Sequence, residues 1–306
     1  MIDNTDVLVV GTGYLGHQVA QMSRQQGAQV YATTRRKNRF ESITQAGFRP
    51  IQFDWTRPST FGNLPIGALS DGGRVLVAVS YDPKSGIDRY DSQVGGLRNL
   101  LRILPANVRI CYISTTGVYH QTDGCWVNET SPTHPRRLGG SVHLQAEQVL
   151  HVRRPAAPWM VLRLAGIYGP GRVPRAADVI AGRPIEAPET GYLNLIHVRD
   201  AAHAVLAAWQ RMGQCWDRPP IGMQSRLYVV ADDRPVVRGD FYREIANLCG
   251  APIVRFKPPA ADAPVRTRSE SNKRVWNRKL RRDLLTSLEF PDCASGLADV
   301  LQPPIE

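Results

Sequence analysis

A glycine turn between a short apolar strand and a helix constrains this chain more than any other feature. Residues 7–10 form a Val-Leu-Val-Val run, which is typical of a buried strand in a parallel sheet. The turn Gly-Thr-Gly-Tyr-Leu-Gly follows at 11–16, and apolar residues then recur at helical spacing until Gly27. A second strand is predicted over 29–33. Strand, turn, helix and strand within about 30 residues indicate a βαβ unit.

In this context the pattern G-x-G-x-x-G predicts a dinucleotide-binding turn. Gly11 permits the tight turn, Gly13 lets the backbone approach a pyrophosphate, and Gly16 lets the helix pack close to the strand. The free N–H groups and the dipole at the helix N-terminus then hold the phosphates. The predicted cofactor contacts are Gly11, Gly13, Tyr14, Leu15, Gly16, Thr34, Arg35, Arg36, Asp54 and Ser80.

The end of the second strand selects the cofactor. NAD sites place an Asp or Glu there for the ribose 2′-hydroxyl, whereas NADP sites use Arg for the 2′-phosphate. Here residues 34–39 read Thr-Arg-Arg-Lys-Asn-Arg, and no acidic residue lies between Asp6 and Glu41. The sequence therefore predicts NADP, with NAD disfavoured. A solvated basic loop is the alternative interpretation.

Further strands predict the fold class and the division into domains. A third strand over 50–53 ends at Asp54, which we expect at the adenine edge, and a fourth over 74–80 ends at Ser80. We expect an α/β protein: a Rossmann doubly wound parallel sheet with a smaller C-terminal substrate domain. The expected NADP-binding domain spans 1–165, with 191–231 returning to it, and the expected substrate-binding domain spans 166–306.

Composition and charge exclude several classes of protein. With 42% hydrophobic and 21% charged residues the chain is typical of a soluble globular protein, and no run approaches the about 20 apolar residues of a membrane span. Five cysteines without a C-x-x-C pair predict no metal site and favour a reducing cytoplasm. The net charge of +11 gathers partly at 265–282, where eight basic residues face a single Glu270. No nucleic-acid-binding motif accompanies them, so we expect a solvated basic helix and loop and no nucleic-acid partner.

Several ordered motifs resemble one known family. Those at 90–101, 110–119, 129–132, 163–172 and 196–202 resemble extended short-chain dehydrogenases/reductases of the NAD(P)-dependent epimerase/dehydratase family, and 271–280 resembles the closing motif of its atypical members. The resemblance implies an oxidoreductase or epimerase that acts on a small polar, sugar-like substrate. It also implies a Tyr-x-x-x-Lys pair for proton chemistry.

That pair is missing from this chain. With Glu147 setting the register, Gly139 takes the Tyr position and His143 the Lys position, and no lysine lies between Lys84 and Lys257. The segment therefore predicts that the usual proton chemistry is unavailable. An alternative function, a catalytically silent NADP-binding sensor or regulatory protein, stays open for this reason.

Three residues are the candidates for catalysis. Thr115 matches the family's substrate-polarising Ser/Thr, with a strand-end capping hydroxyl as the alternative. Tyr119 can present a phenol to the substrate, although it is also a packing residue in the family. His143 can hold the nicotinamide ribose in place of the lysine and titrates near neutral pH, with a surface or capping histidine as the alternative.

The substrate and the assembly are less constrained. Nucleotide-sugar enzymes of the family commonly carry an Arg at the position of Leu193, so the usual diphosphate site is in doubt. We expect a small-molecule substrate and either a monomer or a homodimer. His197, in an apolar context, is interpreted as a core histidine, and His134 as a loop residue.

Overall fold

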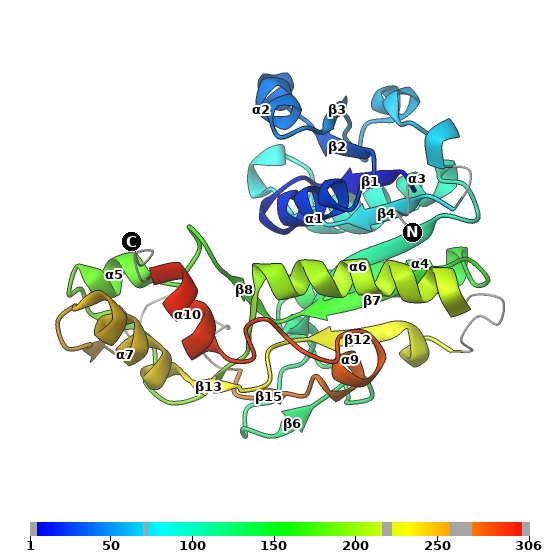
Figure 1. Cartoon of the computed structure of the whole chain (residues 1–306). Helices are drawn as coiled ribbons and strands as arrows, with labels where there is room; N and C mark the ends of the chain where they lie inside the picture. Colours follow the sequence, from blue (N-terminus) through cyan, green and yellow to red (C-terminus); the bar gives the residue numbers. More distant parts are fainter. Residues whose placement is uncertain (1–4, 70–71, 216–221, 258–270, 302–306) are drawn as a thin grey trace. The chain divides into compact units, whose positions relative to one another are not determined.

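The computed structural model describes residues 5–69, 72–215, 222–257 and 271–301 (Figure 1). The chain divides into two compact units. The first comprises the residues up to Thr115 together with Leu138–Arg163 and Ala202–Tyr228. The second comprises Thr116–Arg137, Leu164–Ala201 and the residues from Val229 onward. The sequence-based boundaries, 1–165 with 191–231 and 166–306, stay predictions.

A seven-stranded parallel sheet with the order β12-β7-β5-β4-β1-β2-β3 forms the centre of the first unit. Val7 pairs in parallel with Val30 on one side and with Arg74 on the other. The strands are β1 (Val7–Val10), β2 (Val30–Thr34), β3 (Arg49–Gln52), β4 (Arg74–Val77), β5 (Arg109–Thr115), β7 (Trp159–Leu164) and β12 (Leu227–Val230). β1 and β4 are buried along their whole length, as expected for strands covered on both faces.

Helices flank this sheet on both faces (Figure 1). They are α1 (Tyr14–Gln25), α2 (Phe40–Gln45), the π-helical turn Asp91–Gly95 with α3 (Gly96–Ile103), α4 (Leu138–Arg153) and α6 (Val198–Cys215). α1 contacts β1 and β2, whereas α4 contacts β5 and α3. The predicted doubly wound Rossmann sheet is confirmed.

The second unit is built from short elements. Its strands are β6 (Trp126–Val127), β8 (Gly166–Tyr168), β9 (Ile185–Glu186), β10 (Tyr192–Leu193), β11 (Leu195–His197), β13 (Val236–Val237), β14 (Phe256–Lys257) and β15 (Arg274–Val275). Its other helices are α5 (Ala176–Ile180), α7 (Arg238–Cys249), α9 (Arg278–Asp283) and α10 (Cys293–Leu301). α7 packs against α5 and α10 around Tyr168, Phe241 and Leu297.

The helix α7 begins at Arg238, so Asp240 lies within its first turn and not at its N-cap. Its carboxylate pairs instead with Arg243 at 2.8 Å, because the two residues share one helix face. The expectation of a solvated basic stretch over 265–282 is wrong at Lys273, whose exposed fraction is 8%. Residues 266–270 of that stretch lie outside the described residues.

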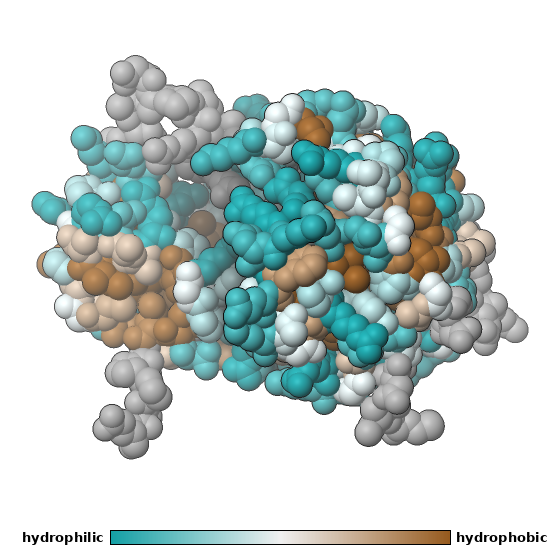
Figure 2. Space-filling model, turned by 90° about the horizontal axis from the view of Figure 1, so that it is seen from above, coloured by the Kyte–Doolittle hydropathy of each residue, from teal (hydrophilic) through white to brown (hydrophobic). Residues whose placement is uncertain are grey.

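The surface carries no extended apolar face in the view of Figure 2, where hydrophobic residues form separate patches among hydrophilic ones. Among the residues that the structure describes, the exposed large apolar side chains are Tyr90, Trp126, Leu138, Val152, Ile180 and Ile253. A helix with the length and apolar character needed to cross a membrane does not occur in the part of the chain that the structure describes.

A buried ion pair joins α4 to the sheet. The Arg163 guanidinium on β7 donates to both carboxylate oxygens of Glu147 on α4, at 3.0 and 2.6 Å. The Ser114 hydroxyl on β5 donates to the same carboxylate at 2.6 Å. Both charged residues are at most 3% exposed. The two buried charges compensate each other, so removal of either side chain would leave the other charge buried without a counter-ion.

We expect Glu147→Ala to lower the free energy of unfolding by roughly 3–5 kcal/mol, because it leaves the buried Arg163 charge uncompensated. Urea unfolding followed by circular dichroism measures the change. Glu41→Ala, at an exposed glutamate of α2, is the matched control and should stay within about 0.5 kcal/mol of the parent. Equal losses in the two variants would contradict the assigned role of the ion pair.

Candidate cofactor and active site

The glycine turn leaves open space where a phosphate group would approach. Gly11 has a φ of +98°, and its N–H donates to the Thr33 hydroxyl at 3.0 Å. A Cβ at Gly16 would overlap the Gly11 carbonyl oxygen, so α1 starts against the turn only because this position is glycine. Around Gly13 no described atom lies within 4 Å of a Cβ position. Together these features make a cradle at the N-terminus of α1, whose first turn carries no acidic residue.

A pocket of the first unit extends from this turn along the carboxyl ends of β1, β2, β3 and β4. Seven of the ten sequence-predicted contacts line it: Gly11, Gly13, Thr34, Arg35, Arg36, Asp54 and Ser80. Tyr14, Leu15 and Gly16 are not among its lining residues, and the Leu15 side chain is buried in the core. Arg39 of the basic segment 34–39 and Asp82 also line the pocket, as do Trp55, Ser85 and Ile87, which the sequence did not single out.

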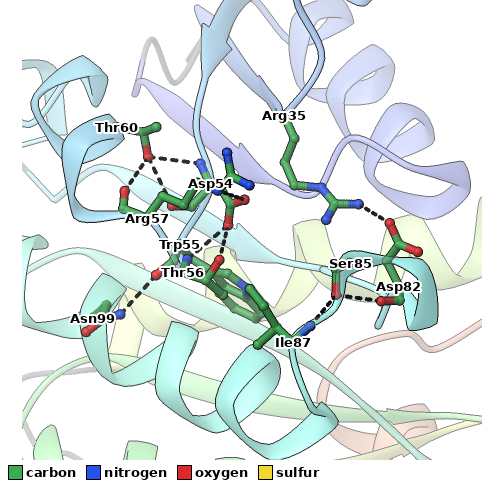
Figure 3. Close-up of polar contacts among 10 residues, drawn as sticks. All are labelled: Arg35, Asp54, Trp55, Thr56, Arg57, Thr60, Asp82, Ser85, Ile87 and Asn99. Atoms are coloured by element: carbon green, nitrogen blue, oxygen red, sulfur yellow. Dashed lines mark hydrogen bonds and ion pairs between the residues drawn. The ribbon is translucent and has the colours of Figure 1, made fainter.

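Basic side chains gather at the β2 end of the pocket. The Arg35 guanidinium pairs with the Asp82 carboxylate at 2.7 Å (Figure 3). This hydrogen bond, followed by that from the Lys84 backbone N–H, holds the pKa of Asp82 below its usual value. The Arg39 guanidinium donates to the Thr12 carbonyl at 3.1 Å. Arg36 forms no ion pair with any described carboxylate, so its charge stays available at the pocket wall.

Asp54 at the end of β3 is held in place by its own loop. Its carboxylate accepts from the Thr56 N–H at 3.0 Å and from the Thr56 hydroxyl at 2.6 Å (Figure 3). The Trp55 side chain between them is buried, and the Trp55 carbonyl accepts from the Asn99 side chain at 3.1 Å. The loop is thus anchored to α3, and Asp54 presents a fixed acceptor to the pocket.

His143, at the family's lysine position, is mostly buried on α4. Its Nδ1 lies 3.0 Å from the Tyr112 hydroxyl of β5. Burial lowers the pKa of His143 below its ordinary value; Glu147 opposes this, and Arg89 lowers the pKa further. Burial also raises the pKa of the Tyr112 phenol. At neutral pH the pair is therefore an uncharged imidazole and an uncharged phenol, not the cation that a lysine would supply.

Arg89 lies beside the position left empty by the missing tyrosine. A Cβ at Gly139 would lie 3.4 Å from Arg89 Nη1 and 3.8 Å from its Cζ. The Arg89 guanidinium carbon stacks 4.2 Å above the centre of the Tyr81 ring. Arg89 forms no ion pair with a carboxylate of the described residues. Sequence reasoning missed this residue, because it lies 50 positions before Gly139, at the helical start that leads into the turn Asp91–Gly95.

The remaining candidates lie in different parts of the fold. Thr115 is the last residue of β5, in the same unit as His143. Tyr119 belongs to the second unit, and its side chain is 1% exposed. Their roles in catalysis stay predictions.

The two histidines that the sequence interpreted as non-catalytic, His197 and His134, lie in a core and in a loop. His197 is fully buried in the second unit, where its ring packs 4.0 Å from that of Phe290, and burial lowers its pKa to about 4. His134 is an exposed loop residue. Among the described residues, no three His, Cys, Asp or Glu side chains are grouped so that they could bind a metal ion.

Comparisons with known proteins agree with this geometry. The model of the NAD dependent epimerase/dehydratase family matches residues 7–215. Protein YeeZ of Escherichia coli (strain K12) is 26% identical over 253 residues, which are 82% of this chain and 86% of that protein.

Two solved structures extend the likeness over almost the whole chain. A functionally unknown conserved protein from Silicibacter pomeroyi is 30% identical, with a TM-score of 0.74 over 97% of this chain and 100% of its own. A UDP-glucose-4-epimerase from Stenotrophomonas maltophila, with bound NAD and formylated UDP-arabinopyranose, shares the fold at 21% identity. Its TM-score is 0.78 over 97% of each chain.

The contact between Arg89 and the α4 segment leads to a prediction about pH. We expect Arg89→Gln to raise the pKa of His143, because it removes a positive charge that opposes protonation of the imidazole. NMR titration of the imidazole signals measures this pKa. Arg98→Gln, an exposed arginine of α3, is the control and should leave the pKa of His143 unchanged. An unchanged or lower pKa in Arg89→Gln would exclude the contact.

Proposed function

Because the chain belongs to the NAD dependent epimerase/dehydratase family, we propose that it is an NADP-dependent oxidoreductase or epimerase acting on a small polar, sugar-like substrate. One observation carries the preference for NADP. At the end of β2, where an NAD site needs a carboxylate, the pocket has Arg35 and Arg36 side by side. Asp82, whose carboxylate also reaches this end of the pocket, comes from another loop and is already paired with Arg35.

The residues of the pocket suit a dinucleotide. The open space at Gly13 and the acid-free start of α1 suit a pyrophosphate, Arg36 suits a 2′-phosphate, and Asp54 suits a hydrogen-bond donor of the adenosine. When bound, the nicotinamide ring supplies or accepts a hydride. We also propose that the NADP-binding domain comprises 1–165 with 191–231, and the substrate-binding domain 166–306.

We assign the substrate chemistry to Thr115, Tyr119 and His143. The Thr115 hydroxyl would polarise a substrate carbonyl or hydroxyl at the end of β5. Tyr119 or His143 would handle the proton. The lowered pKa of His143 means that its imidazole is unprotonated at neutral pH. This supports a role as a neutral hydrogen-bonding group or as the base that accepts a proton during the reaction.

A catalytically silent NADP-binding sensor or regulatory protein is the second candidate. It is favoured by Gly139, which cannot replace a phenol, and by the uncharged His143 at the lysine position. Both candidates need the cofactor, but only the enzyme needs Thr115. Turnover of a carbonyl sugar by the parent protein, reduced in Thr115→Ala with NADPH binding retained, would decide for the enzyme.

The preference for NADP gives a direct prediction. The parent protein should bind NADPH more tightly than NADH, and Arg36→Gln should reduce that preference by roughly tenfold, because a charge-assisted contact to the 2′-phosphate is lost. Calorimetric titration with each cofactor measures the ratio. Lys37→Gln is the matched control, because Lys37 is an exposed neighbouring base that does not line the pocket.

Two results would contradict this assignment. If NADPH and NADH bind the parent protein equally, Arg35 and Arg36 do not read a 2′-phosphate. If Lys37→Gln and Arg36→Gln reduce the preference equally, the effect belongs to the overall charge of the loop rather than to the pocket.

A further inference from the structure

Lys273 is a buried lysine in the middle of the basic stretch 265–282. It is 8% exposed, and its ammonium donates to the Ser271 hydroxyl at 2.8 Å. None of the carboxylates in the described part of the chain forms an ion pair with it. Its basic neighbours in sequence are placed differently: Arg274 stacks on Trp126, and Arg278 stacks on Trp276.

A buried ammonium without a counter-ion is costly, and lysines are almost never buried unless they are paired. The protein tolerates the cost partly by making protonation less favourable: burial lowers the pKa of Lys273 to about 8. At neutral pH the side chain still carries its charge most of the time. Its unused hydrogen-bonding capacity therefore points to a partner outside the part of the chain that the structure describes, such as a bound ligand.

The chain places Lys273 beside the segment that follows Tyr119. The Asn272 N–H donates to the Gln121 carbonyl at 2.9 Å, and β15 then runs parallel to β6, with Arg274 opposite Trp126. These bonds join residues about 150 positions apart, within the second unit.

Gln121 has a second unused polar atom. Its side-chain N–H donates to the Pro132 carbonyl at 3.1 Å, which orients the amide. Its Oε1 is buried and has no hydrogen-bond partner among the residues that the structure describes. Such an oxygen accepts from a hydroxyl or an amine. The paired segments thus offer a cationic donor and a neutral acceptor.

We propose that Lys273 and Gln121 form the polar part of a substrate site for a hydroxylated small molecule that carries an anionic oxygen group. The ammonium of Lys273 pairs with the anionic group, and Gln121 Oε1 accepts from a hydroxyl. The identification of this ligand as the substrate rests on the proposed function, whereas its binding does not. The site favours a sugar acid or a sugar phosphate over a neutral sugar.

The test observes the lysine directly. The chain has five lysines, Lys37, Lys84, Lys257, Lys273 and Lys279, so lysine labelled with ¹³C at Cε gives few signals. Lys→Arg changes at the other four assign the Lys273 signal by elimination and leave the proposed site intact. In the parent protein without cofactor, this signal should titrate near a pKa of about 8, because burial disfavours the ammonium.

Three probes separate the ligand chemistries: D-glucuronate, D-glucose 6-phosphate and D-glucose. At least one charged probe should raise the pKa of Lys273 by about one to three units, because an anion close by stabilises the ammonium. The Lys257 signal, from an exposed lysine of the same unit, should not move, and D-glucose should have no such effect. A response to glucuronate alone or to the phosphate alone identifies the anionic group.

Variants test the two contacts separately. Lys273→Met should abolish binding of the charged probe and Gln121→Leu should weaken it by about fivefold to tenfold, whereas Lys257→Met should leave it unchanged. If Lys273→Met does not fold, the titration of the parent protein still decides. The proposal is overturned if neither charged probe moves the Lys273 signal, or if Lys257 responds equally. The titration is done without cofactor, so it tests the Lys273 site even if the protein does not bind NADPH.

Discussion

The ion pair between Glu147 and Arg163 is the contact on which the arrangement of the candidate site depends. It joins α4 to β7, and the Ser114 hydroxyl extends the contact to β5, so one buried carboxylate fixes a helix against two strands. His143 and Gly139 lie one and two turns before Glu147 on the same helix, and their positions follow from that register. The same carboxylate also opposes the lowering of the His143 pKa. The Glu147 carboxylate therefore both positions α4 and influences the protonation of His143.

The loss of the tyrosine and lysine does not leave the site without polar groups. The space at Gly139 lies against the guanidinium of Arg89, which the Tyr81 ring supports from one side. Where the family has a phenol beside an ammonium, this chain has a fixed cation beside a neutral imidazole and a buried phenol, Tyr112. The site thus keeps a positive charge, but Arg89 carries it beside Gly139 and the lysine position on α4 is uncharged. A guanidinium does not exchange its proton in this pH range, so any proton transfer must involve a different group.

The basic surplus of the chain divides into side chains with different surroundings. Arg35 is paired with Asp82, Arg36 faces the pocket without a described counter-ion, and Lys273 is buried beside a serine. These three charges count equally in the composition. Their chemical meanings differ because burial and counter-ions decide whether a cation is solvated, bound or available.

The sequence by itself determined the βαβ unit and the glycine turn and indicated seven residues that line the pocket, because each is encoded locally. A run of buried β-branched residues specifies β1, and the steric demands of Gly11 and Gly16 specify the turn. Only the tertiary structure decided which residues adjoin Arg35, Gly139 and Asn272. These residues are Asp82, Arg89 and Gln121, and they lie 47, 50 and about 150 positions away. Contacts across such separations depend on how the elements pack and leave no periodic trace in the sequence.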